Sequence, residues 1–245
     1  MTDSACDGTP WLSAPHNGRA RPDMHLMSPP SRLVDGLRSA VEALWTQFVR
    51  RRRRSEPVVD RAGFRRFLHT RSNYVAQHSL YGYLRTRLGI RFPELFNDDA
   101  FVRSINIAKW HVWLACLSDL AVYAGGLALH RAQAPAADVA RLVSEAVEGI
   151  LGEVGVPDEA GEQFAEHAAR VRSRIALCDW KSIPDDDSAF TESPTALVRW
   201  APVTEELKVL DEEIVKNSIR FRWQEIRRAL RNDLDALRVL DSPAP

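Results

Sequence analysis

Cysteine is scarce in this sequence of 245 residues, and its placement excludes two common ways of stabilising a fold. The three cysteines, Cys6, Cys116 and Cys178, lie far apart, and neither a C-x-x-C pair nor a cluster with histidine accompanies them. Disulfide frameworks and structural zinc sites need paired or clustered cysteines. We therefore predict neither a disulfide framework nor a metal site, and nothing in the sequence points to a cofactor.

Catalytic sequence motifs are also missing. The chain contains no G-x-S-x-G nucleophile elbow, no G-x-x-x-x-G-K-[ST] phosphate loop, no G-x-G-x-x-G loop and no H-E-x-x-H motif. The Glu-x-x-His pairs of di-iron helical bundles are absent too. Catalytic residues therefore stay unassigned, and no motif supports an enzymatic activity directly.

An uncharged run long enough to span a bilayer comfortably is lacking as well. The longest apolar run, Val112–Leu129, has 18 residues, at the lower edge of a membrane span. Asp119 lies near its middle, where an acid costs about 2.5–3.5 kcal/mol on insertion scales. We expect a central helix that neighbours surround on nearly every side. The amino terminus does not resemble a secretory signal, so the expected compartment is the cytoplasm.

Net charge is zero and the sequence pI is about 7.1, so wholesale electrostatic capture of nucleic acid is not expected. The run Arg50–Arg54 is a local exception, and it ends a predicted helix whose dipole it would complement. Such a run could also contact an acidic protein, a nucleic-acid backbone or a membrane surface. Aromatic interleaving and a recognition helix are missing, which disfavours nucleic acid as the partner.

The proline positions and the apolar spacing predict an all-α protein, a single bundle of six or seven helices. Residues 1–30 hold five prolines and are predicted to be a disordered arm, and residues 31–241 form the predicted bundle domain. Long proline-free intervals repeat apolar residues by three and four, as helices do. The expected helices cover about 31–54, 60–89 (one bent helix or two), 98–131, 136–152, 157–178 and 202–240, with a polar connection after 178.

Two helical faces combine polar and aromatic residues. Asp119 in the central helix needs a partner if it is buried, and we expect an arginine from another helix. Tyr74, His78, Tyr81 and Arg85 stand at spacings of four, three and four, so they share one face of the 60–89 helix. If that face meets the side of 98–131 that carries His111 and Asp119, the result is a polar pocket for a small ligand. The alternatives are a structural ion pair at Asp119 and ordinary amphipathic packing of the tyrosines.

The predicted last helix carries the clearest signal for association. Its first half, VTEELKVLDEEIV, is acidic and its second half, KNSIRFRWQEIRRALR, is basic. Two copies could therefore lie antiparallel, with acidic halves against basic halves. An apolar seam runs along the helix and shifts phase near Asn217. The predicted interface residues are Phe221, Trp223, Ile226 and Leu230. The alternative is that this helix folds back on its own domain.

These observations favour a non-enzymatic cytoplasmic protein that acts by binding other proteins, as a regulator, adaptor or assembly factor. Its expected partner is a protein, which includes a second copy of the chain in an antiparallel homodimer. The alternative function is a small-molecule-binding protein or hydrolytic enzyme with a pocket between the 73–88 and 98–131 helices. A third alternative is surface attachment to a membrane through the arginine run.

Overall fold

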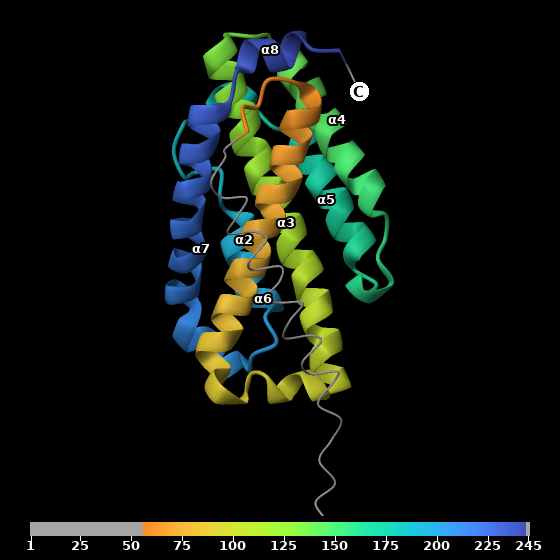
Figure 1. Cartoon of the computed structure of the whole chain (residues 1–245), viewed down its shortest axis with the longest axis vertical. Helices are drawn as coiled ribbons and strands as arrows, with labels where there is room; N and C mark the ends of the chain where they lie inside the picture. Colours follow the sequence, from red (N-terminus) through yellow and green to blue (C-terminus); the bar gives the residue numbers. More distant parts are fainter. Residues whose placement is uncertain (1–55, 244–245) are drawn as a thin grey trace, which may run out of the picture. The chain divides into compact units, whose positions relative to one another are not determined.

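A computed structural model of the chain describes residues 56–243, which form seven α-helices and no β-strand (Figure 1). The predicted all-α bundle is confirmed. The predicted arm (1–30), the predicted helix at 31–54 and the arginine run lie outside the described residues. The helices are α2 (Arg61–Leu88), α3 (Asp99–Ala132), α4 (Ala136–Val154), α5 (Phe164–Ala176), α6 (Glu192–Trp200), α7 (Glu205–Asp233) and α8 (Ala236–Asp241).

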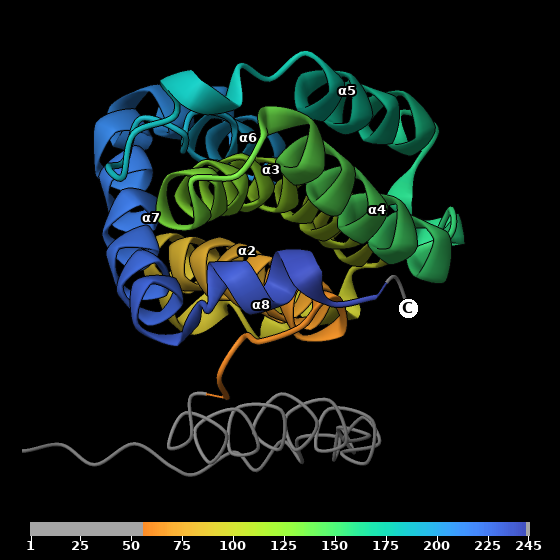
Figure 2. The ribbon, with the colours of Figure 1, turned by 90° about the horizontal axis from the view of Figure 1, so that it is seen from above.

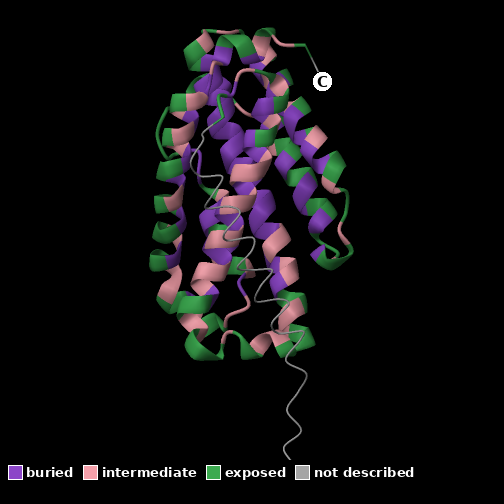
Figure 3. Ribbon diagram, in the orientation of Figure 1, coloured by how far each residue is buried: buried purple, intermediate pink, exposed green. Residues whose placement is uncertain are grey.

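Helix α3 is the centre of the bundle, as the apolar run predicts. The Asp98 carboxylate caps its first turn by accepting hydrogen bonds from the N–H groups of Ala100 and Phe101. Every residue of 111–129 is buried, and α2, α4, α5 and α6 pack around it (Figures 2 and 3). Among the described residues α3 is the one helix long and apolar enough to cross a membrane, and its most apolar window is wholly buried.

Helix α2 is one continuous helix, which settles the choice left open by the sequence. Asp60 accepts a hydrogen bond from Gly63 N–H at 2.6 Å and starts the helix. Gly89 ends it with a φ of 56°, a backbone conformation that favours glycine. Helices α4 and α5 are amphipathic and cover one side of α3 (Figure 2).

The single helix predicted for 202–240 is wrong. The structure has two helices in this range, α7 and α8. Pro202 lies just before α7, and α6 precedes it in the stretch that was expected to be a connection. The break between these two helices follows Asp233, where Val58 N–H donates to Asp233 O at 2.8 Å and Asp235 N–H donates to Val58 O at 3.0 Å. These bonds come from a residue far away in the sequence, so helical periodicity alone does not reveal the break.

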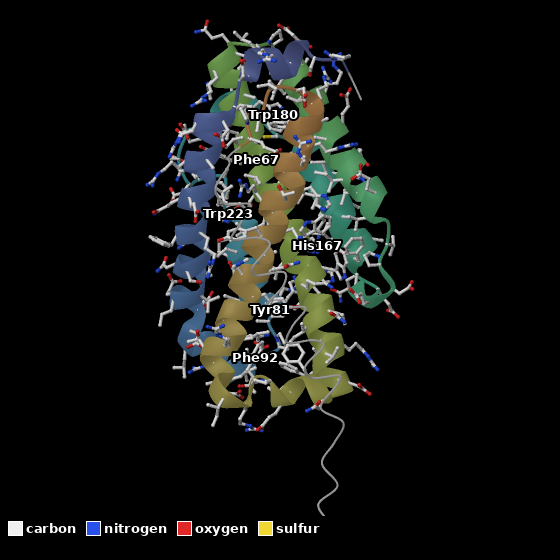
Figure 4. The ribbon with its side chains drawn as sticks, in the orientation of Figure 1. Phe67, Tyr81, Phe92, His167, Trp180 and Trp223 are labelled. Atoms are coloured by element: carbon white, nitrogen blue, oxygen red, sulfur yellow. The ribbon has the colours of Figure 1, made fainter. Side chains whose placement is uncertain are left out.

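The polar connection after residue 178 is more ordered than expected. It contains a short 3-10 helix, Trp180–Ser182, that packs against α3, and Trp180 is buried. Gly125 makes this approach possible, since a Cβ atom there would lie 2.2 Å from the Trp180 ring. Ile183 approaches Gly126 in the same way. The two glycines inside the apolar run therefore form a seat for this segment. Figure 4 labels Trp180 inside the bundle.

Candidate functional site: buried polar centres and the two faces of α7

Asp119 forms the first polar centre, between α3, α5 and α6. Its carboxylate accepts a hydrogen bond from Arg174 Nη1 at 2.7 Å, which confirms the expected arginine partner. It also accepts the backbone N–H groups of Glu192 at 3.1 Å and Ser193 at 2.8 Å. Because these are the first residues of α6, Asp119 caps that helix from a neighbouring one and meets the positive end of its dipole.

The network around Asp119 extends to α7. Trp223 Nε1 donates to Ser193 Oγ at 2.9 Å, and Arg174 also donates to the carbonyl oxygen of Ala189 at 2.8 Å. Burial raises the pKa of Asp119, while the charge and hydrogen bond of Arg174 and the bonds from Ser193 act in the opposite direction. Each carboxylate oxygen has at least one donor, so this centre serves as a structural clamp that joins α3, α5, α6 and α7.

His111 forms the second polar centre, nearer the start of α3. Its Nδ1 lies 2.9 Å from Nδ1 of His167 on α5, so the N–H of one imidazole donates a hydrogen bond to the ring nitrogen of the other. The Trp200 ring of α6 stacks on His111 with centroids 3.7 Å apart and an angle of 7° between the planes. Figure 4 shows His167 on the same side of the bundle as α5. Both centres therefore lie where α3 packs against α5 and α6.

The histidine pair is neutral near pH 7. Burial lowers the pKa of His111 to about 4 and that of His167 to about 4. The positive charges of Arg199 and Arg170 act in the same direction on both rings, whereas the backbone of Ala160 raises the pKa of His111. Nε2 of His111 is buried without a hydrogen bond of good geometry among the described residues. A neutral ring tolerates that environment far better than an imidazolium would.

The face of α2 that the sequence singles out lies elsewhere. The rings of Tyr74 and His78 are in contact, with centroids 4.1 Å apart, and His78 Nδ1 lies 3.0 Å from the Tyr74 carbonyl oxygen. Tyr81 is partly buried; burial and, to a smaller extent, the charge of Glu159 raise its pKa. Arg85 is exposed.

The six residues of the predicted pocket are thus not brought together around one space. The two polar groups of the central helix, His111 and Asp119, contact α5 and α6. The polar stripe belongs to α2, a different neighbour of α3. Sequence spacing identifies which residues share a face of one helix, but it does not identify the helix that the face meets.

Three of the four predicted interface residues lie in the core. Trp223, Ile226 and Leu230 are buried on the side of α7 that packs against α2 and α6, and Figure 4 shows Trp223 between the helices. Trp223 is fully buried, and its indole N–H donates to Ser193 Oγ inside the bundle. The fourth residue, Phe221, is 71% exposed.

The opposite side of α7 carries an apolar stripe in solvent. Leu210 and Ile214 are each 72% exposed, and together with Phe221 they repeat by four and seven residues along one line of the helix. At 100° per residue this line lies about 180° from Ile219 and Leu230 on the buried side. Two apolar residues of the seam before Asn217, Leu210 and Ile214, lie on the exposed face, and most of those after it lie on the buried face. This change of face accounts for the phase shift in the sequence. We call Leu210, Ile214 and Phe221 the α7 outer stripe.

Sequence reasoning missed several residues of the polar centres. His167 and Arg174 are seven residues apart in α5 and flank Val171 and Ile175 on its buried side. Plotting α5 as an amphipathic helix places both polar side chains at the edge of its apolar face, which was an available signal. Ser193 and Trp200 gave no such signal, because the helix that contains them was assigned to a connection.

Comparison with known proteins does not supply a function. Neither a model of a protein family, nor a curated protein, nor a solved structure matches this chain. Its function is therefore inferred from the geometry of the described residues.

Proposed function

We propose that this protein acts by binding another protein through the outer face of α7, as a cytoplasmic regulator, adaptor or assembly factor. The observation that carries the proposal is the α7 outer stripe, three large apolar side chains on one line of a helix, each more than two-thirds exposed. Single exposed apolar residues are common on soluble proteins, but contiguous ones mark interaction sites. Aromatic residues such as Phe221 are frequent anchors of such contacts.

The inner face of α7 holds the helix against the rest of the bundle. Its inner face is filled by large apolar residues and secured by the Trp223–Ser193 hydrogen bond, so the helix is held in place without its outer stripe. Tyr83 Oη and Arg87 Nε of α2 also bind the Asp211 carboxylate, at 3.1 and 2.9 Å. A rigid helix that presents apolar side chains is a preorganised binding surface.

The alternative function, a small ligand or substrate bound between the 73–88 and 98–131 segments, has less support. Asp119 and His111 contact α5 and α6, and Asp119 has donors on both carboxylate oxygens. A carboxylate in this state is a poor candidate for a general base, because a base needs a free lone pair within reach of its substrate.

Photo-crosslinking in cells tests the proposed function. The photoreactive residue p-benzoylphenylalanine replaces Phe221 in the full chain, and in a matched control it replaces Ile90, which is 93% exposed and lies outside α7. We expect a discrete adduct with one protein, identified by mass spectrometry, from position 221 only. Absence of an adduct at 221, or the same adducts from both positions, would overturn the proposal.

A further inference from the structure

The residues along the outer face of α7 have a symmetric spacing. Asn217 lies at the centre, and the face continues in both directions through positions that are four, seven and eleven residues away. The positions are Glu206, Leu210, Glu213, Asn217, Phe221, Gln224 and Arg228. Steps of three and four residues keep one line on a helix facing a neighbour, as in a coiled coil. Every helix has such positions on both sides of a residue, so two antiparallel copies that meet at Asn217 bring these positions opposite each other, and the chemistry of the residues decides whether they fit.

We propose that the partner of the α7 outer face is a second copy of this chain, with the two α7 helices antiparallel and a two-fold axis at Asn217. This inference rests on the proposed function, since it uses the same surface. In this arrangement a residue of one copy faces a residue of the other copy when their two numbers add up to 434. Closed two-fold pairing through a self-complementary patch is the commonest form of oligomer.

The charges at the two ends of the stripe favour this arrangement. Glu206 faces Arg228 of the second copy, and by symmetry the pair occurs twice. Both side chains are exposed, and within the described residues the ion pairs of α7 involve other groups and leave these two unpaired. A parallel pair would instead bring Glu206 beside Glu206 and Arg228 beside Arg228, which repel.

The apolar side chains fit the same alignment. Phe221 of one copy lies opposite Glu213 of the other copy. On that other helix, Leu210 and Ile214 stand next to Glu213. Such a side chain inserts into a hole formed by four residues of the facing helix, here Leu210, Glu213, Ile214 and Asn217. Each copy supplies one phenylalanine and receives one. The three exposed apolar residues of each stripe are thereby covered, which removes apolar surface from water.

Residues 31–54 of the same chain are a less suitable occupant of this face. They join the described part at Glu56, and Val58 is hydrogen-bonded to Asp233 at the end of α7. In the sequence, Arg50–Arg54 come a few residues before Val58, and Val58 lies at the end of the basic half of α7. A helix from 31–54 laid along α7 would face like charges at that end.

Two single charge reversals test the pairing in the full-length protein. Glu206→Arg and Arg228→Glu each place like charges opposite each other, twice per dimer, and we expect each variant alone to dimerise about tenfold more weakly than the wild type. Mixed in equal amounts, the two variants regain opposite charges at both ends and should form a heterodimer close to wild-type affinity. Glu166→Arg, an exposed acid on α5, is the control for the charge change. Sedimentation velocity measures the wild type, the two variants, their mixture and the control.

A cysteine placed on the two-fold axis provides an independent test. In a Cys6→Ser, Cys178→Ser background, Asn217→Cys should form a disulfide between two chains on mild oxidation, because the two positions face each other. Gln224→Cys, which faces Leu210 of the second copy, should not. Preferred crosslinking at 224, or a mixture of charge variants that stays monomeric, overturns the antiparallel pairing.

The self-pairing and the proposed function fail in different ways. A wild-type chain that is monomeric when pure, but gives a position-221 adduct with a different protein in cells, overturns only the self-pairing. A crosslink from position 221 to residues 31–54 of the same chain overturns both, and so does a monomer without any adduct.

Discussion

Helices α3 and α7 are both long, but they use polar and apolar residues in opposite ways. Helix α3 is buried over the whole of 111–129 and carries His111 and Asp119 inside the bundle. Helix α7 buries only one side and carries Leu210, Ile214 and Phe221 in solvent. The unusual residues of α3 are explained within the chain, since each meets partners on α5 or α6. The exposed apolar residues of α7 are not explained in this way by the described residues, and this is why we propose a partner for them.

This difference is the reason that the proposed function uses the exposed apolar residues of α7 and not the buried polar residues of α3. A charged group in a core must be paired whatever the protein does, because an unpaired buried charge is too costly. Exposed apolar residues have no such requirement, and Leu210, Ile214 and Phe221 lie on the side of α7 away from the side that packs against α2 and α6. The predictions below test this contrast between the two helices, in order of decreasing effect on the free energy of unfolding.

Removal of the Asp119 carboxylate should have the largest effect. Asp119→Ala removes the shorter of the two ion pairs of Arg174, which keeps only the contact with Glu192 at 3.5 Å, and it leaves the N–H groups of Glu192 and Ser193 without their carboxylate acceptor. Breaking a buried pair in this way costs about 3–5 kcal/mol of unfolding free energy. Urea unfolding measures it, with Asp119→Asn as the isosteric comparison, which should cost less. A loss below about 1 kcal/mol for Asp119→Ala would contradict a structural clamp.

Filling the glycine seat on α3 should have an intermediate effect. In Gly125→Ala the new methyl group would lie 2.2 Å from the Trp180 ring and 2.9 Å from Val143. Overpacking of this kind typically costs about 1–3 kcal/mol. Gly152→Ala on α4 is the matched control, because no atom lies within 4 Å of its Cβ position. That control should raise stability by about 0.5–1 kcal/mol through helix propensity, and equal effects of the two changes would refute the packing of Trp180 on α3.

Acidification should weaken the fold through the histidine pair. The folded-state pKa values of His111 and His167 are lowered to about 4 from 6.5, mainly by burial. Between pH 6.5 and 4 the unfolded chain therefore binds more protons, so the free energy of unfolding falls as the pH falls through that window. The double variant His111→Gln, His167→Gln should show a shallower decline. Replacement of the exposed His130 by glutamine is the control, and an unchanged slope in the double variant would contradict the neutral pair.

Truncation of the α7 outer stripe should have the smallest effect on folding. Phe221→Ala removes an exposed ring, so the free energy of unfolding of the monomer should change by no more than about 0.5 kcal/mol. Trp223→Ala, two residues further along on the buried side, should cost about 3–5 kcal/mol. Denaturant unfolding at high dilution compares the two. A similar loss for both residues would mean that the two faces of α7 do not differ as described.

The sequence was sufficient to predict the helical class and most helix positions, because proline positions and apolar spacing act locally. Asp98 before α3 and Asp60 before α2 are capping residues next to the turns they cap. The helix predicted for 202–240 was not divided into α7 and α8 because the break after Asp233 depends on a distant residue, Val58. The partner of Asp119 could be predicted as an arginine but not as Arg174, since electrostatics sets the kind of partner and only the packing of α5 selects the residue.

The two faces of α7 show the same limit at the candidate site. A line of apolar residues with a phase shift was visible in the sequence, and it combined Phe221 with Trp223 in one predicted interface. The two residues lie on opposite sides of the helix, since two positions differ by about 200° around the axis. The direction of the core decides which side is free. That direction follows from the contacts of α7 with α2 and α6, which the sequence of α7 does not contain.

The solution mass of the full-length chain tests the central claim most directly. Multi-angle light scattering compares the wild type with a variant in which Leu210, Ile214 and Phe221 are all changed to glutamine, and with Ile90→Gln as the exposed-residue control. We predict a dimer, twice the chain mass of 27.6 kDa, for the wild type and the control, and a folded monomer for the triple variant. A monomer in all three samples, or a dimer that survives the triple change, would contradict an α7 outer stripe that joins two copies.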